Sequence, residues 1–327
     1  MESNSMIQPE SEARNWLELP AEVMFMILVK LGAIDILSSA QNVCSSWRKI
    51  CKDPPMWRVI DMHNSGELDA DMYLDYNLES MCRHAVDRSC GQLVDINIEY
   101  FGTDELLQHI AHSSNQLRRL RILDCYDISD EGLTEAVSKL PLLEHLEIFL
   151  CSFDVETLKT VGRCCPLLKS LKLNKQFYRG LRMGRDDEAL AVAETMPKLQ
   201  QLQICGNGLT NMGLQAILDG CPDLESLDLR GCFNLYLEGE LEKRCAESIK
   251  VLYLPHDSTD GCELSIKTIN CHDCDSKDVD CSSGFSRIGF FPDYDVDYHR
   301  FFGDSYFLDD DDFPRYGSSG DDDFLDY

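Results

Sequence analysis

The chain has 327 residues, 44% of them apolar, which is enough for one large domain or two smaller ones with a true core. Its net charge of −28 argues against nucleic-acid partners, because binding phosphate backbones requires a basic face. The first residues are polar and acidic, unlike a signal peptide, and no run approaches the roughly 20 apolar residues of a membrane span. We therefore expect a soluble protein of the nucleus, the cytoplasm or both, with no membrane partner and with residues 1–14 disordered.

Residues 15–60 predict a small all-α module of three short helices, over residues 20–31, about 35–43 and about 45–51. Pro20 favours a helix start because its fixed φ suits the first turn, and Gly32 favours the end of the same helix. Asp35 can cap the second helix, and the prolines at positions 54 and 55 follow the third. A module this small rarely builds a sufficient core by itself, so we expect a partner to cover part of its apolar surface.

The same segment resembles the F-box motif. That motif begins Leu-Pro-x-Glu, continues with an Ile-Leu pair, a single Leu and an Asp, and ends with Val-Cys-x-x-Trp-Arg and a later Trp. The matching residues are Leu19, Pro20, Glu22, Ile27, Leu28, Leu31, Asp35, Val43, Cys44, Trp47, Arg48 and Trp57. The resemblance implies docking to a Skp-type adaptor, which in turn binds a cullin–RING scaffold.

Carried over by position, the motif residues are candidates for adaptor binding in two roles. Those expected at or beside the interface are Leu19, Pro20, Glu22, Ile27, Leu28 and Leu31. Those expected to hold the helices together or to cover the seam are Val43, Cys44, Trp47 and Trp57. Leu19 and Pro20 are the preferred direct contacts. The alternative makes Leu28, Leu31, Val43 and Trp47 plain core, and we favour it for Val43 and Trp47.

Residues 61–89 predict a linker that ends in a helix over residues 73–88. Its apolar positions are Leu74, Leu78, Met81, Cys82 and Ala85. We expect this helix to cap the first of the repeats that follow and to tie it to the F-box, because the end unit of a repeat protein needs a cover.

Residues 90–256 contain a sevenfold repeat. The pattern aliphatic-x-x-aliphatic-x-aliphatic begins at residues 93, 117, 143, 168, 199, 224 and 249, with spacings of 24, 26, 25, 31, 25 and 25 residues. Each copy predicts a short half-buried strand, and helical stretches follow over residues 130–140, 154–163, 187–196 and 211–219. One such unit cannot bury its own apolar face, so the units must stack. The predicted fold is α/β: an all-α F-box followed by a leucine-rich-repeat solenoid of about seven strand–helix units.

Many of the sixteen cysteines fall at positions set by the repeat. Cys125, Cys151 and Cys232 follow the last aliphatic residue of a unit by three positions, where the chain turns inward, and Asn207 takes that place in another unit. We expect reduced thiols that act as small buried groups, not disulfides. Together with the F-box, residues 15–256 resemble the plant F-box/leucine-rich-repeat proteins. That resemblance implies the substrate receptor of a ubiquitin ligase and no catalytic activity of the chain itself.

Solenoids of this kind bind partners on the strand face, where residues that alternate with the buried aliphatics point outward. The substrate-binding candidates on that face are Arg119, Arg121, Phe149, Lys172, Arg230 and Tyr253. The two aromatic residues are the most suggestive, because aromatic side chains are favoured in binding hot spots. For any single residue, a solvated sheet face is the favoured alternative.

The 31-residue unit contains an insertion, residues 175–185, with four basic residues and no acidic one. We hypothesise that it contacts an acidic or phosphorylated partner, since guanidinium groups bind such groups well. The residues proposed for this contact are Phe177, Tyr178, Arg179, Arg182 and Arg185. An equally weighted alternative is a flexible insertion that meets the chain's own acidic tail.

Residues 257–327 predict an acidic, low-complexity tail, disordered from about residue 293. Cys271, Cys274 and Cys281 include a single C-x-x-C without a matching pair, so we predict no metal and no cofactor. No phosphate loop, dinucleotide fingerprint or nucleophile elbow is found, and we assign no catalytic residue. Two alternatives to a ligase receptor remain: a repeat scaffold that holds the adaptor without promoting degradation, and a metal- or cysteine-dependent enzyme.

Overall fold

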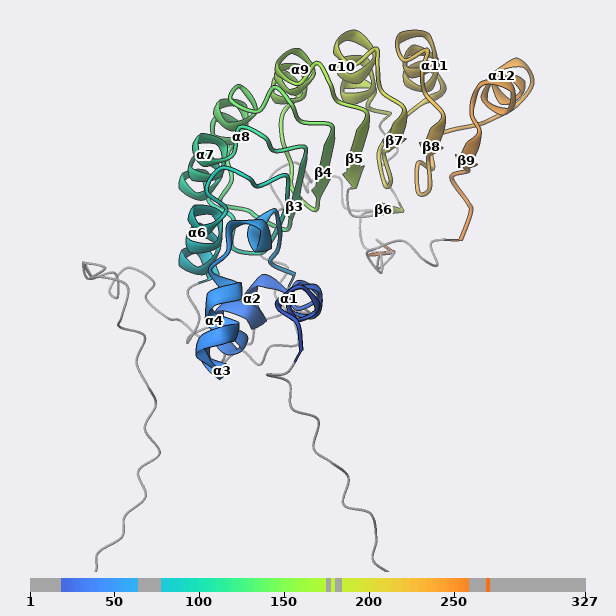
Figure 1. Cartoon of the computed structure of the whole chain (residues 1–327). Helices are drawn as coiled ribbons and strands as arrows, with labels where there is room; N and C mark the ends of the chain where they lie inside the picture. The colour runs from blue at the N-terminus through green and yellow to red at the C-terminus, as the bar shows by residue number, and fades with distance from the viewer. Residues whose placement is uncertain (1–18, 64–77, 175–177, 180–183, 259–268, 271–327) are drawn as a thin grey trace, which may run out of the picture. The chain divides into compact units, whose positions relative to one another are not determined.

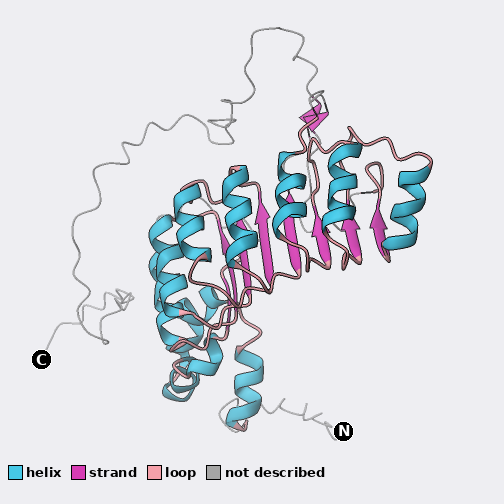
Figure 2. Ribbon diagram, turned by 90° about the horizontal axis from the view of Figure 1, so that it is seen from above, coloured by secondary structure: helices cyan, strands magenta, loops and turns pink. Residues whose placement is uncertain are grey.

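The computed structural model describes residues 19–63, 78–174, 178–179, 184–258 and 269–270. This part begins with a group of short helices and continues into a parallel sheet, and the helices between the strands lie on one face of the sheet (Figures 1 and 2). The predicted α/β class, with an all-α module before a leucine-rich-repeat solenoid, is confirmed. The disorder expected for residues 1–14 and for the tail from residue 293 concerns residues outside the described ranges.

The N-terminal helices are α1 (Ala21–Leu28), α2 (Ala33–Asp35), the π-helical η2 (Ile36–Ala40), α3 (Gln41–Val43), α4 (Ser45–Cys51) and the 3-10 helix η3 (Pro54–Trp57). α1 begins directly after Pro20, whose carbonyl accepts the N–H of Met24 at 3.0 Å. α2, η2 and α3 form one helical run that begins after Gly32, so the prediction of a cap at Asp35 is wrong. The extended Gly32 already separates the two helices, and Asp35 therefore falls within the first turn.

Eight parallel strands form the sheet, in the order β1-β2-β3-β4-β5-β7-β8-β9. They are β1 (Val59–Asp61), β2 (Asp95–Glu99), β3 (Arg119–Leu123), β4 (His145–Phe149), β5 (Ser170–Asn174), β7 (Gln201–Gln203), β8 (Ser226–Asp228) and β9 (Val251–Tyr253). The seven predicted strands are all confirmed. β1 is an addition that the repeat pattern does not predict, yet its buried Ile60 lies in register with Ile96 of β2.

The helices of the sheet region are α6 (Leu78–Arg88), α7 (Asp104–Ser113), α8 (Asp130–Val137), α9 (Val155–Cys164), α10 (Asp187–Thr195), α11 (Asn211–Gly220) and α12 (Glu240–Ser248). The four predicted repeat helices are confirmed as α8 to α11. The predicted linker helix is confirmed from Leu78 onward, and residues 73–77 lie outside the described residues. α6 packs against α2 and η3 on one side and against α7 on the other, so it joins the F-box to the first repeat.

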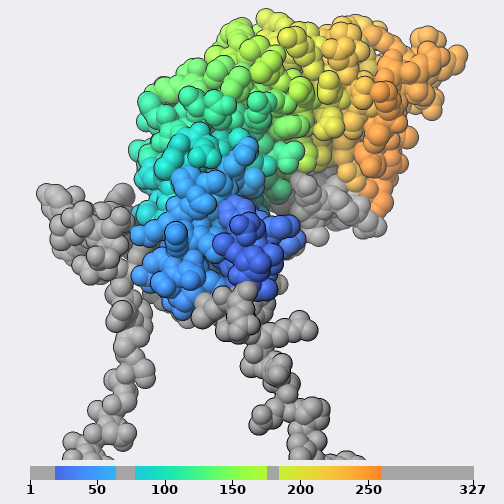
Figure 3. All heavy atoms as spheres, in the orientation of Figure 1, coloured from blue at the N-terminus to red at the C-terminus, as the bar shows by residue number. Residues whose placement is uncertain are grey.

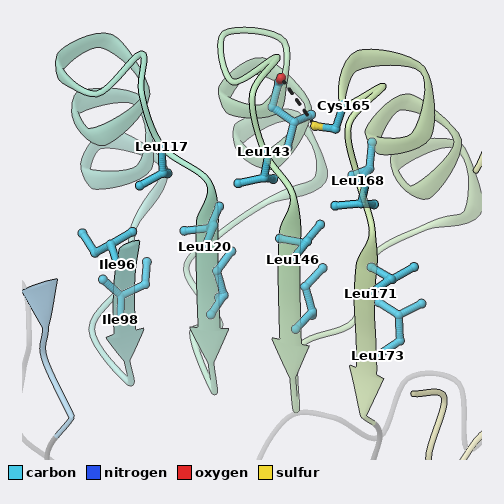
Figure 4. Packing of buried hydrophobic residues seen from close by; sticks show 14 of the residues in the cluster. Ile96, Ile98, Leu117, Leu120, Leu143, Leu146, Cys165, Leu168, Leu171 and Leu173 are labelled. Atoms are coloured by element: carbon cyan, nitrogen blue, oxygen red, sulfur yellow. Dashed lines mark hydrogen bonds between the residues drawn. The ribbon is translucent and has the colours of Figure 1, made fainter. Parts of the chain in front are cut away.

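The core of the solenoid consists of aliphatic rows that run across the strands. Ile96, Leu120, Leu146 and Leu171 lie in register in four neighbouring strands and are fully buried between the sheet and its helices (Figure 4). Each such side chain contributes about 1.5–3 kcal/mol when it is removed from water. Stacking of the units therefore supplies the core that one unit lacks.

The turn positions after the strands behave as predicted. Cys125, Cys151 and Cys232 are buried, and their Sγ atoms donate to the backbone carbonyls of Leu123 at 3.2 Å, Phe149 at 3.3 Å and Ile204 at 3.0 Å. Burial raises the pKa of the Cys125 and Cys232 thiols to about 12. All twelve cysteines in the described part of the chain are free. The nine buried ones therefore act as small packing groups with a weak donor.

The starts of successive helices are linked by hydrogen bonds that we call the capping ladder. Ser129, the N-cap of α8, donates through N and Oγ to the Asp104 carboxylate of α7 at 2.8 and 2.6 Å. The backbone N–H groups of later units repeat this bond, from Asp154 to Asp130 (2.8 Å), Thr210 to Asp186 (2.8 Å) and Tyr236 to Asn211 (2.9 Å). Gly132 is required beside the first of these bonds, because a Cβ there would overlap the Asp104 carboxylate.

A second, two-stranded sheet lies outside the solenoid sheet. A two-residue strand in the insertion, β6 (Tyr178–Arg179), pairs in parallel with β10 (Ile269–Asn270). No helix of the described residues is long and apolar enough to cross a membrane.

Candidate functional site: an F-box surface and a strand face

The F-box exposes an unusual number of large apolar side chains. We define the F-box apolar patch as Leu19, Val23, Met26, Val29, Leu31 and Val43. Met26 is 65% exposed and Val43 is 61% exposed, although the same module buries a core of other apolar residues. In Figure 3 the α1 residues, in the darkest blue, lie on the surface of the F-box. Large exposed apolar side chains gathered on one small module favour an interaction site in soluble proteins.

The origin of the patch lies in the sequence of α1, AEVMFMIL, which is apolar on more than one side. Met24 and Leu28 point inward and are buried, while Val23, Met26 and Val29 fall on other faces of the helix and stay exposed. A helix that is apolar all round is normally covered all round. The second face of α1 is therefore the part of the F-box that a partner would cover.

The structure separates the motif residues into three groups. Leu19, Pro20, Glu22, Leu31 and Val43 are exposed, Ile27, Cys44 and Trp47 are partly buried, and Leu28 and Trp57 are fully buried. The plain-core alternative is therefore right for Leu28 and wrong for Leu31 and Val43. As a direct adaptor contact, Leu28 is corrected to a core residue, because α1 turns it inward.

Sequence reasoning missed Val23, Met26 and Val29, which do not belong to the motif. The available signal was their spacing of three residues along α1, on the side away from Met24 and Leu28.

Trp57 joins the F-box to the solenoid. Its Nε1 donates to the Cys51 carbonyl at 2.8 Å, and the Arg88 guanidinium of α6 lies over its ring at 5.6 Å from the centroid. Arg88 also donates to the Cys51 carbonyl at 3.5 Å. These contacts fix α4 and η3 against α6, so the F-box and the repeats are rigidly connected at this point.

A basic hollow lies next to Val43. It has a volume of about 450 Å³ and is lined by Cys44, Ser45, Arg48, Lys49 and Lys52, all at or within α4. The start of α4 is capped by Cys44, whose Sγ accepts the N–H of Trp47 at 3.4 Å. Arg48 is held by a bond from its Nε to the Gln41 carbonyl at 3.2 Å.

The strand face of the solenoid, which the helices leave open, pairs most of its own charges. Arg119 lies 3.9 Å from Asp95, and Lys172 lies 3.3 Å from Glu147, which is only 7% exposed. Burial raises the pKa of the Asp95 carboxyl, and the Arg119 charge opposes that shift. Arg119 remains well exposed, whereas Lys172 is largely covered. Both lie on the strand face as predicted.

Two candidates on this face are corrected. Phe149 is only 1% exposed, because the Arg121 guanidinium from the neighbouring strand lies over its ring at 4.9 Å. Arg230 is also buried, since it forms an ion pair with Asp228 and donates to the Ser258 carbonyl at 3.1 Å. Tyr253, with the Arg230 guanidinium 4.5 Å from its centroid, is exposed as expected.

The insertion is only partly described. Arg185 is exposed, and its backbone N–H donates to the Gly208 carbonyl at 2.9 Å. Tyr178 and Arg179 form β6, whose partner strand β10 belongs to residues 257–327 but contributes no acidic residue. Phe177 and Arg182 lie outside the described residues, as do Cys271, Cys274 and Cys281. Within the described ranges, no group of three His, Cys, Asp or Glu side chains could hold a metal ion.

Comparisons with known proteins agree with this architecture. Residues 16–63 match the F-box-like family. Over 274 residues the chain is 58% identical to the F-box protein SKIP19 of Arabidopsis thaliana, which covers 84% of this chain and 87% of that protein. It is 53% identical over 255 residues to putative F-box/LRR-repeat protein 23 of the same plant, covering 78% of this chain and 56% of that protein.

Among solved structures, the leucine-rich repeat-containing protein LegL7 from Legionella pneumophila is 12% identical, with a TM-score of 0.39, over 71% of this chain and 77% of that chain. The F-box at residues 16–63, the stacked strand–helix units and the 58% identity to SKIP19 lead to one conclusion. The chain belongs to the plant F-box/leucine-rich-repeat family.

Proposed function

We propose that the chain is the substrate-recognition subunit of a Skp–cullin–F-box ubiquitin ligase, in the nucleus, the cytoplasm or both. The F-box docks on a Skp-type adaptor and through it on a cullin–RING scaffold, while the solenoid presents a protein substrate for ubiquitination and degradation. Members of the F-box family are generally adaptors and not catalysts. The free cysteines fit a reducing compartment.

The observation that supports adaptor docking most strongly is the F-box apolar patch. Removing a side chain the size of Met26 or Val43 from water contributes about 1.5–3 kcal/mol at an interface. Met24 and Leu28 are buried on the inner side of α1, which holds that helix to the F-box core. Leu19, Pro20 and Leu31 extend the same surface at the two ends of α1.

A ligase receptor must hold its substrate at a fixed place relative to the docked adaptor. The contacts of Trp57 with Cys51 and Arg88 support this role, because they join the docking module rigidly to the first repeat. Such a subunit contributes to the reaction by proximity and orientation alone. It needs no catalytic residue of its own.

For the substrate, the strand face offers Arg119 and Tyr253 as its exposed candidates. Arg119 can bind a carboxylate or phosphate at the expense of its long contact with Asp95. An acidic or phosphorylated substrate fits this site, with Arg121 of the same strand and Lys172 of β5 supplying further positive charge. The exposed Arg185 beside β6 is a further candidate.

The first test is a pull-down of Skp-type adaptor and cullin with the full chain and with a Met26→Asp/Val43→Asp variant. The proposal expects the wild type to recover both proteins and the variant to lose them. Met212→Asp is the matched control, because Met212 is 80% exposed on α11 and far from the F-box in sequence. Failure of the wild type to recover the adaptor would refute the proposal.

A second measurement separates the ligase receptor from the scaffold alternative. Proteins bound to the solenoid are identified with the wild type, and their cellular abundance is then compared with that in cells expressing Met26→Asp/Val43→Asp. A receptor that promotes degradation predicts that a true substrate accumulates when docking is lost. Unchanged abundance and turnover of every bound protein would favour a scaffold that holds the adaptor without promoting degradation.

A further inference from the structure

The charge distribution of the F-box differs from that of the rest of this strongly acidic chain. Between Asp35 and Asp53 the sequence contains no acidic residue, although the chain has 58 of them. The same stretch supplies Arg48, Lys49 and Lys52, which line one side of the basic hollow. Positive charge is therefore concentrated at one place on the surface of the F-box.

Lys49 and Lys52 also differ from most basic side chains of the solenoid in their ion pairing. In the described part of the solenoid, most basic side chains form ion pairs, including Lys139 with Glu135, Lys159 with Glu194 and Lys169 with Glu144. No ion pair to Lys49 or Lys52 is found among the described residues, and both are exposed. Two neighbouring ammonium groups without a counter-charge favour an anionic group from outside the chain.

The hollow is held in shape by the surrounding structure. Cys44 caps α4, Cys51 at its other end is fully buried, and the bond from Arg48 to the Gln41 carbonyl fixes α4 against the first residue of α3. Val43 of the F-box apolar patch directly precedes the lining residues Cys44 and Ser45. The basic hollow thus adjoins Val43, one residue of the F-box apolar patch.

We propose that the basic hollow receives an acidic segment of the Skp-type adaptor, so that docking combines the F-box apolar patch with an ionic contact at α4. This inference rests on the proposed function. A long polyanion such as a nucleic acid is disfavoured, because the net charge of −28 repels it at longer range. A short carboxylate-rich segment needs only the local field of Arg48, Lys49 and Lys52.

The ionic contact has a distinct physical role. A protein with a charge of −28 repels an acidic partner in general, and a local cationic site admits that partner in one orientation only. Exposed charge pairs act mainly on the association rate and on its salt dependence, whereas the apolar patch governs dissociation. The two parts of the interface can therefore be separated by kinetics.

The experiment measures association and dissociation of the full chain with the purified adaptor at low and high ionic strength. For Lys49→Glu/Lys52→Glu we expect an association rate about tenfold or more below that of the wild type at low salt, and a much weaker salt dependence. The matched control is Lys198→Glu/Lys243→Glu, which reverses two exposed charges of the solenoid that have no ion pair in the described structure. Its association rate should stay within about twofold of the wild-type value.

Each alternative result has a defined meaning. Adaptor binding by Lys49→Glu/Lys52→Glu at wild-type rates would overturn this inference and leave the proposed function intact. The same holds if the difference in association rate between the wild type and Lys49→Glu/Lys52→Glu does not shrink at high salt, or if both double variants slow binding equally. A wild type that does not bind the adaptor at all would refute both this inference and the proposed function.

A charge swap checks that any loss is an interaction and not misfolding. Reversing acidic residues on the adaptor should restore binding to Lys49→Glu/Lys52→Glu and weaken binding to the wild type. Lys49→Gln/Lys52→Gln, which only removes the charges, should show a smaller decrease of the same kind. Loss of binding that no adaptor charge reversal restores would overturn the inference.

Discussion

In the F-box, Met26 and Val43 remain exposed and Lys49 and Lys52 have no ion pair in the described structure. In the solenoid, aliphatic side chains form buried rows, and the strand-face cations Arg119, Lys172 and Arg230 lie beside carboxylates of their own or neighbouring strands. The solenoid thus buries its aliphatic rows and pairs most of its described basic side chains, because each unit has neighbours of the same design. The F-box has no such neighbour on its outer side, and its exposed apolar residues and these two lysines form the surface that we propose for the adaptor.

The largest expected effect is on the free energy of unfolding, and it concerns Trp57, which joins the F-box to the solenoid. Trp57→Ala removes a fully buried ring that contacts Cys51 and Arg88, and we expect a loss of about 3–5 kcal/mol in the free energy of unfolding. Chemical denaturation of the full chain measures it. Trp47→Ala, which truncates a partly buried ring, should cost less. Equal costs for the two would mean that the junction is not a special point.

The contrast between buried rows and exposed patch is tested by a pair of truncations. Leu146→Ala should cost about 2–5 kcal/mol, because it leaves a cavity between β4 and the helix layer. Met26→Ala should change stability by no more than about 0.5 kcal/mol and weaken only adaptor binding. Denaturation curves of both variants provide the comparison. A clear loss of stability in Met26→Ala would show that the patch belongs to the F-box core.

The capping ladder predicts an intermediate effect. Gly132→Ala places a Cβ against the Asp104 carboxylate and should cost about 1–3 kcal/mol, because the bonds to Ser129 must lengthen or break. Thermal unfolding measures the loss. In an Asp104→Ala background the same substitution should cost much less, since the obstructing carboxylate is gone. A cost that is the same in both backgrounds would contradict the steric explanation.

The smallest predicted effect concerns pH. Burial lowers the pKa of His145 on β4 below its ordinary value of 6.5, and the nearby Arg119 charge adds to this shift. The folded chain therefore holds this proton less tightly than the unfolded chain, so stability falls as pH drops below about 6.5. His145→Gln should show a shallower loss of stability in that range. The pH dependence of the unfolding midpoint checks it, and identical slopes for wild type and variant would exclude His145 as a contributor.

The local pattern of the sequence was sufficient for most of the fold. The seven strands were predictable because their alternating aliphatics repeat in every unit, and the turn cysteines because they keep the same offset. β1 was not, since it lies outside the repeat pattern and its pairing with β2 depends on how the F-box packs against the first repeat. Asp35 failed as a cap because a glycine three residues earlier already ends the preceding turn.

The binding surfaces were less predictable, because the exposure of a side chain depends on its contacts with neighbouring elements. Alternation along a strand correctly places Phe149 and Arg230 on the sheet face. Phe149 is nevertheless buried, because Arg121 of the adjacent strand covers its ring. Arg230 is buried because it pairs with Asp228 and donates to the Ser258 carbonyl. Likewise, the F-box motif locates Leu28 and Val43 but does not say which of them faces inward. Such facts depend on packing between elements, which a single sequence does not encode by position.

The capping ladder has a consequence for how the solenoid unfolds. Its bonds join α7 to α9 through Asp104 and Asp130, and α10 to the chain before α12 through Asp186 and Asn211. Between these runs, α9 begins with Val155, which has no side-chain acceptor to offer the next unit, and the insertion follows there. The sheet and the helix layer continue across this point, since β5 pairs with β7 and Lys159 of α9 forms an ion pair with Glu194 of α10. We therefore expect the missing bond to weaken the start of α10 only locally, and hydrogen exchange there should be faster than at the starts of α8 and α9.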